Sequence, residues 1–162
     1  MIKQTFTQFR NAVLNEIISH KGIVRALVIH SKDFLTKNPD NKQKNLIDNP
    51  VKLIRQQVFP YKGVSMTALE QKPYITMELN NFKKRDKNYV RGIVRIYVIC
   101  PEGLEQTDEG SRHDYIVEQL EEVFSETGIG KFEFETRGDI DIKEGFLGHC
   151  IILNITDFHI RN

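Results

Sequence analysis

The sequence predicts an α+β fold in which an antiparallel β-sheet, containing one long hairpin, carries two main α-helices packed on one face. The stretch Val90–Cys100 alternates with a period of two and is rich in β-branched residues, which is typical of a strand. Thr5–Ser19 and Ser111–Glu126 place apolar residues three and four positions apart, as one side of a helix does. The length of 162 residues suits a single domain over 1–162.

The composition excludes several functional classes. Lys and Arg number 23 and Asp and Glu 22, so the net charge of +1 gives no broad basic surface for nucleic acid. No apolar run reaches the roughly 20 residues that span a bilayer, and the N-terminus lacks the apolar segment of a signal peptide. We therefore expect a chain that folds in a cytoplasm and has no membrane partner. Cys100 and Cys150 lie in apolar runs without CxxC spacing, which predicts buried, reduced thiols.

The first third of the chain combines a helix with a long polar segment. Thr5–Ser19 is predicted as the first helix, with Lys21 and Gly22 at its end. Ile23–Ile29 is an apolar run compatible with a helical turn or a strand. Ser31–Pro50 is rich in Asn, Lys and Asp and is predicted as a loop that becomes ordered against partners. Val51–Phe59 is predicted as a strand.

The next two alternating stretches predict a long antiparallel hairpin. Pro73–Phe82 and Val90–Cys100 are joined by a polar tip, Lys83–Asn88. If they pair, Glu78 and Arg95 become neighbours on the outer face. The basic tip is either a solvated hairpin end or a docking element for an acidic partner or nucleic acid. The outer face of the second strand mixes polar and apolar side chains, which predicts that it is half-covered or faces a partner.

The C-terminal half supplies the second helix and the remaining strands. Ser111 and Asp114 have the spacing of a helix N-terminus. Lys131–Thr136 alternates, which predicts a strand with Phe132 and Phe134 inward, and Asp139–Ile142 is a short strand or a connection. Leu147–Phe158 is so continuously apolar that we expect a central strand. One of its faces is predicted to carry Leu147, Ile151, Leu153 and Ile155, and the other Cys150, Ile152 and Phe158.

No motif for catalysis is visible. GxxxxGK[ST], GxGxxG and HExxH are absent, and the five histidines are scattered. His149 and Cys150 are adjacent on a strand and point to opposite faces, so they do not form a catalytic pair. We therefore expect no enzyme, and assign no catalytic, cofactor-binding or metal-binding residue. Capping of the helix start explains Asp114 in the string Arg112-His113-Asp114.

One acidic group has three interpretations. Glu133, Glu135, Asp139 and Asp141 form a solvated sheet face, bind the metal of a nuclease, or line an acidic channel along which DNA slides without sticking.

Certain local strings, in their shared order from about Val58 to the C-terminus, carry a resemblance to a known family. The strings are Val58–Tyr61, Pro73–Thr76 leading to Asn81–Phe82, Thr107–Asp108, Arg112–Ile116, Gly128–Lys131, Gly138–Ile140 and Asp157–Phe158. The chain resembles the tail terminator (tail completion, neck) proteins of tailed bacteriophages of Gram-positive hosts. The resemblance implies an antiparallel sheet with two helices on one face, and no cofactor or reaction.

The resemblance also implies a role in the virion. Such proteins form a ring, typically a homohexamer, at the head–tail interface. The ring caps the tail tube, ends its polymerisation and joins it to the head completion or connector protein. DNA passes through the ring without specific binding. The implied location is the neck of a virion assembled in the host cytoplasm.

On this hypothesis we assign surfaces to the ring subunit. The interface with a neighbouring subunit or the tube is assigned to Lys83, Lys84, Arg85, Lys87, Arg91, Arg95 and Tyr97. The lumen is assigned to Glu133 and Glu135. The alternatives are a head–tail connector or stopper of the adjacent ring, a metal-dependent nuclease using Glu133, Glu135 and Asp139, and a nucleic-acid-binding module using the basic tip. The near-neutral charge argues against the last.

Overall fold

The computed structural model describes residues 2–34, 49–62, 69–84, 89–108 and 110–159. It confirms the α+β class, with a four-stranded antiparallel sheet in the order β1-β2-β6-β5. The elements along the chain are α1 (Ile2–Ser19), α2 (Lys21–Val28), the 3₁₀ helix η1 (Pro50–Leu53), β1 (Tyr74–Lys84), β2 (Tyr89–Pro101), α3 (Glu102–Glu105), β3 (Gln106–Thr107), β4 (Gly110–Ser111), α4 (Arg112–Glu126), β5 (Phe132–Ile140) and β6 (Phe146–His159).

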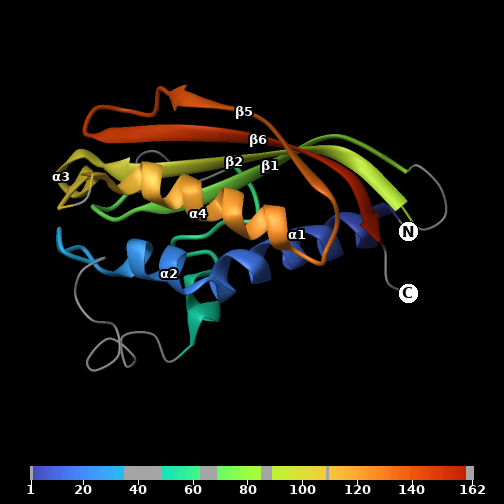
Figure 1. The fold of residues 1–162 in the computed structure, drawn as a ribbon, viewed down its shortest axis with the longest axis horizontal. Coiled ribbons are helices and arrows are strands. Elements are labelled where there is room, and N and C mark those ends of the chain that lie inside the picture. The colour runs from blue at the N-terminus through green and yellow to red at the C-terminus, as the bar shows by residue number, and fades with distance from the viewer. Residues whose placement is uncertain (1, 35–48, 63–68, 85–88, 109, 160–162) are drawn as a thin grey trace.

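The helices α1, α2 and α4 lie on the same side of the sheet (Figure 1). Their apolar stripes pack on the inner side chains of β1, β2 and β6 and form the main core. The apolar run after α1 is therefore a helix that adds a third member to the expected pair, and His20 caps its start by accepting a hydrogen bond from the backbone N–H of Ile23. None of the helices among the described residues is long and apolar enough to cross a membrane.

The predicted hairpin is present, and the two residues expected to be neighbours on its outer face are paired. β1 and β2 pair antiparallel, and Glu78 lies directly opposite Arg95. β2 and β6 are the two central strands, and the position of β6 agrees with the prediction from its continuously apolar sequence. The predicted loop Ser31–Pro50 lies largely outside the described residues, because 35–48 are not among them.

The prediction of a strand at Val51–Phe59 is wrong. Asn49 caps η1 by accepting a hydrogen bond from the N–H of Val51, and Pro50 occupies the first helical turn. The chain then turns at Arg55, whose φ is 67°. Only single bridges follow, from Val58 to Ile54 and Ile75.

Two side-chain predictions are wrong, that for Phe158 because of a bulge and that for Phe134 because β5 is an edge strand. An extra residue in β6, between the pairs Gly92–Ile155 and Val90–Phe158, turns Phe158 into the helix-side core, where it contacts Phe9. Phe134 lies opposite the core residue Leu153, yet is 45% exposed because β5 is an edge strand.

A smaller apolar cluster covers one end of the outer face. Tyr74, Ile99 and Phe146 are buried there under Phe59, Leu69 and Ile142. This agrees with the prediction of a half-covered outer face. Both cysteines are free and buried, as expected. Cys100 belongs to β2 and Cys150 to the neighbouring β6.

One arginine fixes the start of α4 against α2. Arg112 is 1% exposed, and its guanidinium lies 4.4 Å from the centre of the Phe34 ring. It donates hydrogen bonds of 2.7–3.2 Å to four backbone carbonyls. The acceptors are Ala26, Ile29, Ser31 and Leu104. Arg112 thereby satisfies carbonyls at the C-terminal end of α2, which have no partner within that helix.

Candidate functional site

The residues assigned to an interface belong to the β1–β2 hairpin and its tip. Lys83 and Arg91 are exposed and lie opposite one another as Cα partners. Two like charges in this position repel each other, and an acidic partner would relieve the repulsion. Lys84 belongs to β1 by its backbone, whereas Arg85 and Lys87 lie outside the described residues.

Arg95 and Tyr97 are engaged within the chain. Arg95 Nη1 donates to Asn80 Oδ1 at 3.1 Å, and the Tyr97 hydroxyl donates to Glu78 Oε2 at 2.7 Å. Lys62 Nζ lies 5.3 Å from the centre of the Tyr97 ring. Burial, and then the carboxylate of Glu78, raise the pKa of Tyr97. Of this pair, only Arg95 retains appreciable exposure, since Tyr97 is 9% exposed.

The acidic group on β5 is divided between two places. Glu133 is exposed on the outer face, opposite Asn154, and its Oε1 lies 3.6 Å from Lys131 Nζ. Glu135 is also exposed but lies in a bulge of β5, where it has no Cα partner. Asp139 and Asp141 line a pocket that neither glutamate reaches.

That pocket has a volume of about 970 Å³. It lies where the first turn of α4 approaches the beginning of β6 and the connection from β5. Its ionisable lining contains five carboxylates, one lysine and two histidines. These residues are Glu105, Asp114, Asp139, Asp141, Glu144, Lys143, His113 and His149. The lining therefore favours a cation.

His113 is the centre of a partly buried ion pair. Its Nδ1 contacts Glu105 Oε1 closely, and its Nε2 lies 3.3 Å from Asp114 Oδ1. The hydrogen bond to Glu105 raises the pKa of His113 against the opposing effect of burial. Burial would raise the pKa of Glu105, but hydrogen bonds from His113 and Ser111 outweigh it and lower that pKa. Ser111 Oγ also accepts from the N–H of Asp114 and caps α4, as the sequence predicted.

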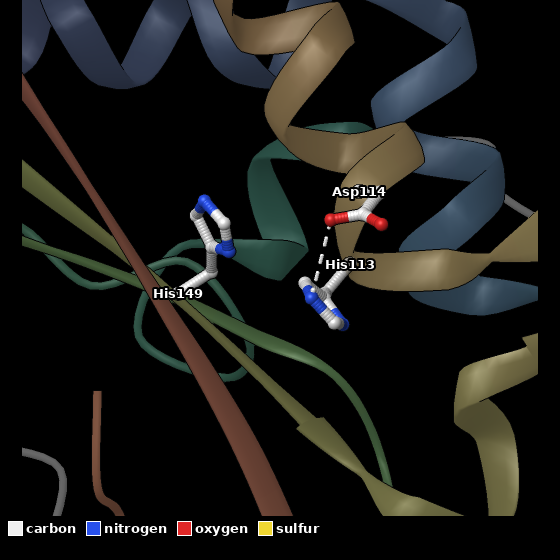
Figure 2. Close-up of side chains that lie close together, drawn as sticks. All are labelled: His113, Asp114 and His149. Atoms are coloured by element: carbon white, nitrogen blue, oxygen red, sulfur yellow. Dashed lines mark ion pairs between the residues drawn. The ribbon is translucent and has the colours of Figure 1, made fainter. Parts of the chain in front are cut away.

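His149 faces this pair from β6 (Figure 2). Its side chain is 9% exposed, its Nδ1 lies 3.2 Å from Asp139 Oδ1, and its ring centre lies 5.4 Å from that of His113. One ligand atom from each of His113, Asp114 and His149, a ring nitrogen or a carboxylate oxygen, lies within 4.8 Å of the other two.

Sequence reasoning treated these histidines as scattered and missed the pocket. Two signals were present: the cap at Ser111 places His113 in the first turn of α4, and strand alternation puts His149 on the same face as Ile151. Neither signal reveals that this turn lies over the beginning of β6. His149 and Cys150 do not form a pair in the structure. This agrees with the alternation of a strand, which puts adjacent residues on opposite faces.

A family model named YomW matches residues 20–155. The chain belongs to the YomW family. The name is that of a phage-type protein, Bacillus SPbeta-like, and specifies no tail terminator role. The match includes all the residues of the pocket and extends through most of the sheet. No curated protein matches the chain.

Proposed function

We propose that the protein is a structural subunit of the phage neck, a tail terminator that forms a ring on the end of the tail tube. Membership of a family with a phage-type name and the resemblance in the local strings support this proposal. The observation on which the proposal mainly depends is the open edge of β5. This nine-residue strand pairs with β6 on one side, and no other described strand pairs with its second edge.

An open edge of this kind is a surface for another chain. Unpaired N–H and C=O groups along an edge can pair with a further strand, except where charges or bulges prevent it. β5 has a bulge at Glu135 and charged side chains at Glu133 and Arg137, so a neighbouring strand can pair with only part of this edge. Residues 133–139 are all exposed, and Phe134 leaves an apolar side chain 45% exposed among them. Figure 1 shows β5 at the border of the sheet. A neighbouring subunit placed against this edge would cover both the backbone groups and Phe134.

The remaining surfaces fit a head-to-tail ring. In such a ring, one patch of each subunit contacts a different patch of the next subunit. The ring closes when the rotation between neighbouring subunits permits it. The β5 edge is one patch, and the basic end of the hairpin, with Lys83 and Arg91, is the other. Glu133 projects from the outer face, perpendicular to the edge contact, and is assigned with Glu135 to the lumen, where negative charge repels DNA phosphates.

Electron microscopy of the purified protein, with and without tail tubes, tests the proposal together with its mass in solution. We expect density that caps tube ends. Phe134→Glu should abolish capping, because the charge would be buried against the neighbour. Val51→Glu is the matched control, since Val51 is 56% exposed on η1, away from the β5 edge.

The outcomes separate the alternatives. If wild-type protein ignores tubes but binds a head completion ring, the subunit is a connector or stopper. If Phe134→Glu caps tubes as well as the wild type does, the β5 edge is not the interface. Replacing Lys83, Lys84, Arg85 and Lys87 by Ser should weaken capping if the tip contacts the tube, and unchanged capping would exclude that role.

A further inference from the structure

We propose that His113, Asp114 and His149 bind a divalent transition metal, with Zn²⁺ as the natural occupant. This site goes beyond the neck function and does not depend on it. Two imidazoles and a carboxylate are the ligands that zinc takes in proteins, whereas Mg²⁺ and Ca²⁺ select oxygen alone. One ligand atom from each of the three residues already lies within 4.8 Å of the others.

The local distances agree with tetrahedral coordination. With metal–ligand bonds of about 2.0 Å, neighbouring ligand atoms of a tetrahedral site lie about 3.3 Å apart. His113 Nε2 lies 3.3 Å from Asp114 Oδ1. His149 Nδ1 lies 3.2 Å from Asp139 Oδ1, so Asp139 is the outer partner of His149 when Nε2 binds the metal.

His113 also has the outer contact that metal-binding histidines use. A ligating imidazole usually donates its second N–H to a carboxylate, which fixes the ring and increases its basicity. Glu105 contacts His113 Nδ1 and is itself held by Ser111, which leaves Nε2 of His113 on the side of Asp114. This arrangement orients the ring before any metal arrives.

His149 supplies an independent observation. Its side chain is nine-tenths buried and lines the pocket, yet its Nε2 has no hydrogen-bond partner among the described residues. An unpartnered buried polar atom is costly and uncommon in folded proteins. A metal ion bound at Nε2 would satisfy this atom and leave Nδ1 in contact with Asp139, and the five carboxylates of the lining attract such an ion.

Isothermal titration of the chelator-treated, dialysed full chain with ZnCl₂ tests the site, and CoCl₂ gives a second reading. We expect one Zn²⁺ per chain, a rise in Tm on binding, and the intense visible absorption of tetrahedral Co²⁺. Asp114→Asn and His149→Gln should each weaken Zn²⁺ binding by about 10-fold or more, the size seen when ligands or their supports are removed. His30→Gln is the matched control, because His30 is exposed and outside the pocket.

Asp114→Asn keeps the proposal testable if His149→Gln does not fold. The Asp114 side chain is 58% exposed and the cap uses its backbone N–H, so this variant should retain the wild-type Tm without metal. Absence of Zn²⁺ binding by the wild type would overturn the proposal. So would equal loss in His30→Gln, or undiminished binding in Asp114→Asn and His149→Gln, which would indicate an adventitious ion only.

Discussion

Replacing Arg112 tests whether one buried cation holds the helical layer together. Arg112→Met keeps most of the side-chain volume and removes every donor. Four backbone carbonyls then lose a hydrogen bond from a charged group, and α4 loses its attachment to the end of α2. A hydrogen bond to a charged group contributes about 1.5–3 kcal/mol, and the desolvation of the guanidinium offsets part of the total.

We therefore expect Arg112→Met to lower the free energy of unfolding by about 3–5 kcal/mol, measured by urea denaturation. In a chain of this length each kcal/mol corresponds to about 2–4 °C, so Tm should fall by roughly 10 °C. Arg112→Lys should be intermediate, because a compact ammonium cannot reach acceptors spread around a planar guanidinium.

Arg137→Met provides the comparison. Arg137 is 48% exposed and pairs with Glu121 at 3.1 Å, so its loss should cost less than about 0.5 kcal/mol. A cost below about 1 kcal/mol for Arg112→Met would refute the reasoning. It would mean that the four carbonyls find other hydrogen-bond partners in the variant, or that the cost of desolvating the Arg112 guanidinium cancels the stabilisation from its hydrogen bonds.

Two further predictions follow from local contacts. A Cβ at Gly92 would overlap the Phe82 ring, so Gly92→Ala should lower the free energy of unfolding by about 1–3 kcal/mol, whereas Gly103→Ala, with open space around it, should be neutral or stabilising in the same denaturation assay. The hydrogen bond from Tyr97 lowers the pKa of Glu78 below its ordinary 4.5. The stabilisation of the folded state by the ionised Glu78 is therefore fully present above pH 4.5 and disappears as the pH falls through the lowered pKa. Tyr97→Phe should therefore cost about 1 kcal/mol at pH 7 and much less near pH 2, and an equal cost at both values would contradict the ionic character of the bond.

The sequence was sufficient for the parts of the fold that depend on periodicity. Alternation located β1, β2 and β6, and it put Glu78 and Arg95 on the same face, where the structure pairs them. Periodicity fails wherever one extra residue enters a strand, because a shift of one position turns every later side chain to the other face. The bulge in β6 therefore reversed Phe158, and only the pairing partner fixes where such a bulge forms. The prediction that Phe134 is buried failed for a different reason. Alternation shows which face of a strand a side chain is on, but it does not show whether a helix covers that face.

The pocket was beyond sequence reasoning because it depends on how α4 lies over the sheet. The string Arg112-His113-Asp114 was interpreted as a helix cap, and the cap is real. Successive helical residues point about 100° apart, however, so Arg112 points away from the pocket, where the side chains of His113 and Asp114 meet. Arg112 enters the core, His113 forms a partly buried ion pair, and Asp114 remains mostly exposed at the pocket. It follows that one tripeptide carries separable effects: changes at Arg112 should act on stability, and changes at Asp114 should act on metal binding with the fold intact.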